Sequence, residues 1–280
     1  MKLFRFETYK IFRRWRTYIS FGFIALIVTM TEVVMKLSAH EILYRMMRSF
    51  QKDFLIFGNV LNGWFITAFI MNSLHIHIPF FITLVAGDIV SNEATSGTVR
   101  LLLIRPPSRS KIITAKYLTT LFYTTGLVIF LGLICVSLGL LLFGNGDLIM
   151  NYQTKFQLVF IPQAEVPLRM LLAFTAAVWS MTVVASLAFL FSTLAENSIG
   201  PIIGTMAVVI VFLVVGNFPF DFFRMLSPYL FTTYMVFWQR FLDDPIPWQE
   251  IAKSAVILGL HDIGLFLIAF IIFNRKDITS

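Results

Sequence analysis

The chain of 280 residues is 58% hydrophobic and only 13% charged, and its mean hydropathy is +0.83. A soluble chain of this size carries roughly a quarter charged residues, so this one has too little polar surface to cover a water-soluble globule. The net charge of +7 does not indicate nucleic-acid binding, because the basic residues lie between apolar blocks, where Lys and Arg orient membrane helices. The composition therefore predicts an all-α, polytopic protein of the lipid bilayer.

Six apolar blocks predict the membrane spans, since about 20 residues cross a bilayer core of about 30 Å. They form a single transmembrane domain over residues 1–280 and lie near 18–34, 60–86, 117–143, 169–191, 199–217 and 251–273. Pro79 lies inside the second block and removes a backbone hydrogen bond, so we expect a kink there. The fourth and fifth blocks are joined only by residues 192–198, which predicts a tight helical hairpin.

The distribution of Lys and Arg predicts the orientation of these spans. With both termini in the cytoplasm, the cytoplasmic segments carry 13 Lys and Arg residues and the external segments carry 7. Basic residues favour the cytoplasmic side, so we expect both termini to be cytoplasmic, although segment 35–55 holds four of the external ones. The basic start followed by an apolar stretch also suggests a secretory signal, but no clear cleavage site follows it.

Residues 1–17 predict a helix that lies in the membrane interface. Phe4, Ile11 and Trp15 fall within about 40° of one another at the helical repeat, with Phe12 alongside. The basic residues occupy the other side of this helix: Lys2, Arg5, Lys10, Arg13 and Arg16. An apolar stripe opposite a basic face is typical of an interfacial helix. A basic flank that only orients the first span is the simpler alternative, and both can hold together.

Residues 86–117 separate the second and third spans and predict a short cytoplasmic helix. Asp88 and Glu93 follow the second span, and Ser96 with Gly97 interrupts the helix. Because a proline disfavours helix in the residue before it, Pro106 and Pro107 end the next stretch, which leaves Thr98–Arg105 as a helix of about eight residues.

The third span is expected to begin with Ser108 as its N-cap, with Arg109, Lys111 and Lys116 near the headgroups. The four consecutive apolar residues 101–104 cannot face water. They must be buried against lipid headgroups, the protein's own helices or a partner, and the residues alone do not decide between packing and docking.

This segment carries a combination of short motifs: G-D, then E, then G-T, a leucine-rich turn, P-x-S-R and a Lys that opens the third span. The residues are Gly87, Asp88, Glu93, Gly97, Thr98, Arg100, Leu102, Pro106, Ser108, Arg109 and Lys116. In this pattern the chain resembles the ABC-2 type permease family, the membrane subunits of bacterial ATP-binding-cassette exporters. The sequences NSIGPIIG at 197–204 and LSPYLFTTY at 226–234 add to the resemblance, and the pair Pro106-Pro107 followed by a second basic run departs from it.

The resemblance implies a permease subunit of a bacterial plasma (inner) membrane that pairs with a second copy or a relative. Two copies of a separate ATPase would bind beneath the pair, and segment 91–105 would couple to them. The coupling residues would be Glu93, Gly97, Thr98, Arg100, Leu102, Arg105 and Arg109. The chain lacks the phosphate loop G-x-x-x-x-G-K-[ST], so we expect no enzyme activity and no cofactor on this chain, with ATP and Mg bound by the partner.

His261 and Asp262 lie near the middle of the sixth span, between Gly259 and Gly264. Ionisable residues at this depth are costly and usually face the bundle interior or a watery path. They are either substrate, proton or subunit contacts, or a hydrogen-bonded pair near small residues that allow close helix packing. Asn72 in the second span is a further candidate for a pathway or subunit contact. The alternatives to a permease are an intramembrane enzyme that uses His261 and Asp262, or a passive channel.

Three further features concern the outer side of the membrane and the second span. Glu32 and Lys253 lie near external span ends, so we expect them to reach the interface. The aromatic segment 218–250 is expected to be partly re-entrant and could form an external gate. His75 and His77 point about 200° apart around a helix and therefore do not predict a metal site.

Overall fold

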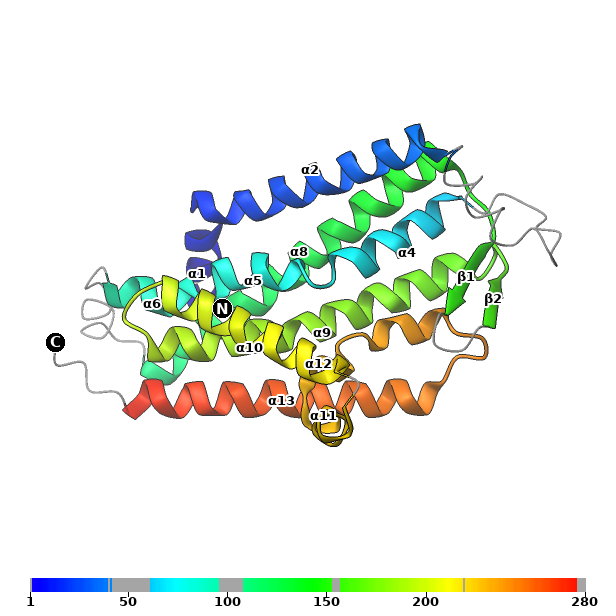
Figure 1. The fold of residues 1–280 in the computed structure, drawn as a ribbon. Coiled ribbons are helices and arrows are strands. Elements are labelled where there is room, and N and C mark those ends of the chain that lie inside the picture. Colours follow the sequence, from blue (N-terminus) through cyan, green and yellow to red (C-terminus); the bar gives the residue numbers. More distant parts are fainter. Residues whose placement is uncertain are drawn as a thin grey trace.

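The computed structural model describes residues 2–39, 41, 61–95, 108–152, 157–218 and 220–275. In these residues the chain forms a bundle of long helices that lie side by side (Figure 1). Five of them are long and apolar enough to cross a membrane: α2 (Trp15–Leu37), α8 (Arg109–Phe143), α9 (Val166–Leu194), α10 (Ile199–Asn217) and α13 (Trp248–Arg275). The chain is thus a helical, multi-pass membrane protein, as the composition predicted.

A sixth candidate span is broken. It consists of α4 (Gly63–Leu74) and the stretch Ile78–Glu93, which are bent by 56° relative to each other. The bend confirms the predicted kink: α5 (Ile78–Ala86) has Pro79 in its first turn, where the missing proline N–H would have no helical partner anyway. At the break, the His77 ring nitrogen Nδ1 lies 3.2 Å from the Ser73 carbonyl oxygen.

The span boundaries follow the apolar blocks at some ends and extend beyond them at others. The fifth block coincides with α10, and the tight turn before it is confirmed because α9 ends at Leu194. By contrast, α8 begins at Arg109 rather than at 117, because the polar residues ahead of the block continue the same helix. Among the five long helices, α9 is the most buried, and it lies between α8 and α13 (Figure 1).

A small β-hairpin departs from the all-α prediction. It joins α8 to α9 through β1 (Leu148–Tyr152) and β2 (Gln157–Ile161), which pair antiparallel with Leu148 opposite Ile161. These two side chains are fully buried. The hairpin lies at the end of the bundle opposite α1 (Lys2–Phe12) and α6 (Asp88–Thr95) (Figure 1).

Beside the hairpin, α4 and α8 pack with almost no space between their backbones. A Cβ atom added at Gly63 would lie 2.5 Å from the carbonyl carbon of Gly139. The Gly63 N–H donates to the Gly144 carbonyl at 2.9 Å. Asn62 caps α4 by accepting from the N–H groups of Trp64 and Phe65, each at 3.1 Å. This contact therefore requires glycine at position 63.

The aromatic segment between α10 and α13 packs along the N-terminal half of α13. It contains four short elements: α11 (Asp221–Leu226), η1 (Ser227–Tyr229), α12 (Phe231–Tyr234) and η2 (Phe237–Leu242). The Phe231 ring lies 6.2 Å from that of His261, and the Phe241 ring lies 5.9 Å from that of Trp248. Hence the segment runs beside the helix from its middle to its first residue. Its depth in the membrane and its role as a gate stay predictions.

The expected position of Glu32 is wrong. Its side chain is fully buried, and neither carboxylate oxygen has a hydrogen-bond partner among the described residues. The reason is that α2 packs against α8, so this side of the helix faces the protein. Lys36, one turn later, donates instead to the Leu142 carbonyl at 2.6 Å. Lys253 is exposed, and its place at the membrane interface stays a prediction.

The glycine contact gives a prediction for folding. We expect Gly63→Ala to lower the free energy of unfolding by about 1–3 kcal/mol, because the new methyl group meets backbone atoms that cannot turn away. The measurement is the thermal unfolding midpoint in detergent.

Gly126→Ala is the matched control, because nothing lies within 4 Å of a Cβ atom at that position of α8. Alanine there should be neutral or stabilising by up to about 1 kcal/mol. Equal midpoints for the two variants would contradict the close approach of α4 and α8.

Candidate functional site

The first helix, α1, packs against α8, and its apolar stripe does not continue to Trp15. It ends at Phe12, and Trp15 opens α2 with 79% of its surface exposed, so the predicted stripe was wrong at this residue. The Phe4 and Phe12 rings lie 5.9 and 6.4 Å from the ring of Phe122 in α8. The turn after α1 is held by Thr17, whose hydroxyl donates to the Ile11 carbonyl at 2.7 Å.

Lys116, in the first part of α8, holds carboxylates from two other helices. Its ammonium group donates to Glu7 Oε2 of α1 at 2.9 Å and to Glu93 Oε1 of α6 at 2.7 Å. Glu93 also pairs with Lys10 of α1. The side chains of Lys116 and Glu7 are each 1% exposed. The predicted headgroup position of Lys116 is therefore wrong, because the residue is an interior link between α1, α6 and α8.

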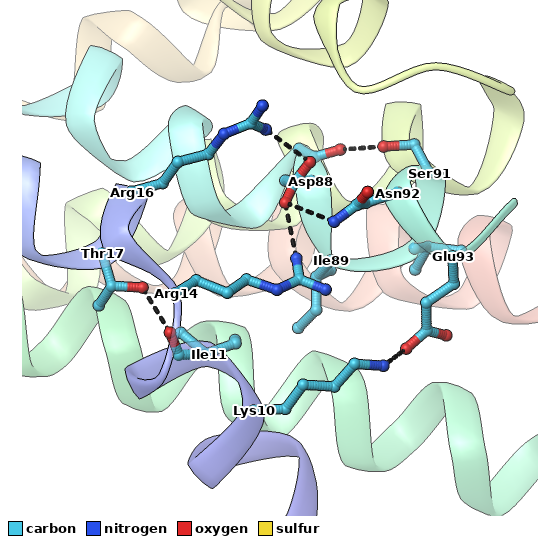
Figure 2. Close-up of polar contacts among 12 residues, drawn as sticks. Lys10, Ile11, Arg14, Arg16, Thr17, Asp88, Ile89, Ser91, Asn92 and Glu93 are labelled. Atoms are coloured by element: carbon cyan, nitrogen blue, oxygen red, sulfur yellow. Dashed lines mark hydrogen bonds and ion pairs between the residues drawn. The ribbon is translucent and has the colours of Figure 1, made fainter. Parts of the chain in front are cut away.

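Asp88 forms a second cluster one turn earlier in α6. Its Oδ2 accepts from Arg14 at 2.6 Å and its Oδ1 accepts from Arg16 at 3.0 Å. Asn92, on the next turn, donates to Asp88 at 3.3 Å. Figure 2 shows the Lys10, Arg14 and Arg16 side chains reaching across to the carboxylates of α6. We call these two clusters together the ion-pair joint: Glu7, Lys10, Arg14, Arg16, Asp88, Glu93 and Lys116.

The ion-pair joint fixes positions more than it adds stability. Moving a charged group out of water costs several kcal/mol, and a partner offsets this only when the geometry is good. Removing one partner is expensive, because the other charge is then buried and uncompensated. Since Lys116 has a carboxylate on each side, α1, α6 and α8 can pack together here only when both carboxylates are in place.

A hydroxyl group of α9 attaches α6 to the core of the bundle. Ser192 Oγ accepts from the backbone N–H groups of Val90 and Ser91 at 3.1 and 3.0 Å. The first N–H groups of a helix have no partner within that helix, so Ser192 caps α6 from another part of the chain. The Ser91 hydroxyl in turn donates to the Gly87 carbonyl at 2.7 Å. Hence α6 is held by α1, α8 and α9.

Of the residues predicted to couple to an ATPase, two lie in the described part of the chain. Glu93 faces inward in the ion-pair joint, so it does not offer its carboxylate to a partner. Arg109 opens α8 and donates to the Asn274 carbonyl at the end of α13 at 3.4 Å. Ser108 precedes α8 as predicted, but its side chain makes no capping hydrogen bond. Five others lie outside the described residues: Gly97, Thr98, Arg100, Leu102 and Arg105.

The predicted pathway residues do not converge on one point. Asn72 in α4 accepts from Gln239 of η2 at 2.7 Å. The Nδ1 atom of His261 lies 2.8 Å from the Ile257 carbonyl oxygen of its own helix. Asp262 instead turns to α9, where the hydroxyls of Thr182 and Ser186 each lie 2.6 Å from its carboxylate. His261 and Asp262 thus have separate partners and do not form a working pair.

Sequence reasoning missed Glu7 and the inward direction of Lys116. One signal was present: Glu7 is the only acidic residue within the basic stretch 1–17. A lone carboxylate among cations in an interfacial helix has no evident use at a lipid surface, so an internal partner could have been sought. In the part of the chain that the structure describes, no three His, Cys, Asp or Glu side chains lie close enough to hold a metal ion.

The joint gives a prediction for Lys116→Met. We expect it to lower the free energy of unfolding by about 3–5 kcal/mol, because Glu7 and Glu93 then remain buried without this cation. Lys111→Met, one turn earlier and exposed, should change it by no more than about 0.5 kcal/mol. Unfolding in mixed detergent measures both, and a small effect of Lys116→Met would show that the carboxylates do not depend on it.

Two comparisons with known proteins show what the chain is similar to. The model of a family described as "Protein of unknown function (DUF2705)" matches residues 22–279, which is nearly the whole chain. The chain is also similar to the "Uncharacterized protein YhcI" of Bacillus subtilis (strain 168), with 27% identity over 229 residues. That match covers 78% of this chain and 71% of the relative.

Proposed function

We propose that this chain, which belongs to the DUF2705 family, is the transmembrane permease subunit of an ATP-driven exporter in a bacterial plasma membrane. Two permease subunits would form the translocation pathway, with both termini of each in the cytoplasm. Two copies of a separate ATPase would dock on segment 91–105 and drive the movement of the membrane helices.

The observation that carries this proposal is the Glu93–Lys116 contact at 2.7 Å. Glu93 lies in the first part of the proposed docking segment, near the end of α6, and Lys116 lies beyond the segment in the first part of α8. A force applied to the segment would reach both helices together, because their charges are buried and cannot separate without a large cost. A connector that only joined two spans would not need this contact.

The helices around the joint offer a route for such a movement. On its N-terminal side, α6 is joined through Gly87 to α5. On the other side of the docking segment, α8 runs through 35 residues to the far end of the bundle. The break between α4 and α5 would let α5 tilt without carrying α4 along. Movement at the docking segment would therefore reach the inner half of the second span and the whole of the third.

The energy source would be another polypeptide. The only Gly-Asn-Gly turn, residues 144–147, has no lysine and lies beside the β-hairpin at the end of the bundle opposite the joint. A phosphate loop needs that lysine to reach the β- and γ-phosphates. ATP and Mg would therefore be held by the partner ATPase.

Co-purification tests the proposal. When the permease is co-expressed with an ATP-binding-cassette ATPase from the same genome, we expect a stable complex. Arg100→Glu should reduce the ATPase recovered by about tenfold or more, since reversing an interfacial charge costs a few kcal/mol. Glu93 is unsuitable for this test, because its replacement would disrupt the ion-pair joint itself.

Lys253→Glu is the matched control, an exposed charge reversal in the first turns of α13, far from the joint. It should leave recovery unchanged, and the thermal midpoints of both variants should equal that of the wild type. Failure of any such ATPase to bind, or transport by the purified chain without ATP, would contradict the proposal.

A further inference from the structure

Asp262 lies near the middle of α13, and its carboxyl group is held between two hydroxyl groups of α9. Ser186 Oγ lies 2.6 Å from Asp262 Oδ1, and Thr182 Oγ1 lies 2.6 Å from Asp262 Oδ2. The phenol oxygen of Tyr117 in α8 lies 2.9 Å from Ser186 Oγ. Four side chains from three helices thus form one hydrogen-bonded chain.

If Asp262 were ionised, the single hydrogen of the Thr182 hydroxyl would have to serve two acceptors. Thr182 Oγ1 also lies 2.6 Å from the Trp179 carbonyl oxygen, which can only accept. A hydroxyl group carries a single hydrogen, and a hydrogen shared between two acceptors is bent away from both, which does not suit two contacts as short as these. If Thr182 donates to the Trp179 carbonyl, the hydrogen between Thr182 and Asp262 has to come from Asp262.

At Asp262 Oδ1, on the other side of the carboxyl group, the donors and acceptors match without an extra proton. Ser186 donates to Asp262 Oδ1, and Tyr117 can donate to Ser186. Every hydroxyl in the chain then donates once. With Thr182 donating to the Trp179 carbonyl, the short contact between Thr182 and Asp262 has room for one additional proton, on Asp262 Oδ2.

The charges around Asp262 agree with this additional proton. Among the described residues no Lys or Arg lies within ion-pair distance of its carboxyl group. Two titratable groups act on Asp262: the phenol of Tyr117, through Ser186, and the adjacent His261, whose ring is turned to the Ile257 carbonyl and to Phe231. An ionised carboxylate without a cation is costly at this depth in a membrane protein.

We propose that Asp262 is a proton-binding site, a neutral carboxylic acid whose O–H donates to Thr182. Release breaks only that O–H bond: the proton passes to water, and the carboxylate that remains keeps the bond from Ser186. Because the site is built between α9 and α13, separation of these helices would expose the acid and release the proton. This inference does not rest on the exporter proposal.

Asp262→Asn tests the site, because an amide matches the neutral acid. Its NH2 group can donate to Thr182 while its oxygen accepts from Ser186. The folded wild type holds a proton that its unfolded chain releases above about pH 4, so this site lowers the stability of the wild type as pH rises and makes no such contribution in the variant. We expect the ratio of the two unfolding constants to change about tenfold per pH unit until the folded acid ionises.

An infrared spectrum gives an independent readout. At neutral pH the difference between wild type and Asp262→Asn should contain the C=O stretching band of a protonated carboxyl group. Thr182→Val should shift this band, because it removes the acceptor of the acid proton. Thr175→Val, exposed on the same helix, should not. Carboxylate bands in place of the acid band, or a stability ratio independent of pH above about 4, would overturn the proposal.

Discussion

The ammonium group of Lys116 is buried between two carboxylates, one from the first helix of the chain and one from the end of the broken span. Apolar packing alone does not specify how membrane helices are placed, because lipid tails are as apolar as the side chains they would replace. Buried charges do specify how the helices are placed, because each is costly without its partner. The positions of α1, α6 and the start of α8 all depend on this one side chain, and Ser192 extends the constraint to α9.

Different kinds of contact hold the helices together at the two ends of the bundle and in its middle. One end is held by ion pairs, and the other by backbones that touch at Gly63 and Gly139 beside a β-hairpin. Between them lies a layer in which helices are broken or joined by hydroxyl groups: the α4–α5 break and the chain around Asp262. Rigid ends with a polar middle suit a protein whose ends keep their packing while the middle changes, as the proposed transport cycle requires.

The spans could be predicted from the sequence because hydropathy over about 20 residues reports depth in a membrane. The range 199–217 followed from hydropathy, and the kink near Pro79 followed from the proline, which lacks a backbone N–H. The inward direction of Lys116 and of Glu32 could not, because hydropathy does not say which way a side chain points around its helix. The partners of Lys116 lie 23 and 109 residues away in the chain, and nothing local to Lys116 identifies them.

The central claim is that the ion-pair joint holds α1 against α8 in one arrangement. Spin labels at Arg5→Cys and Lys111→Cys, both exposed, with Cys135→Ala to remove the native thiol, would report the distance between the two helices in lipid nanodiscs. We expect a single narrow distance distribution that becomes broad when Lys116 is replaced by Met. A distribution that is already broad in the otherwise native chain, or one that Lys116→Met leaves narrow, would contradict it.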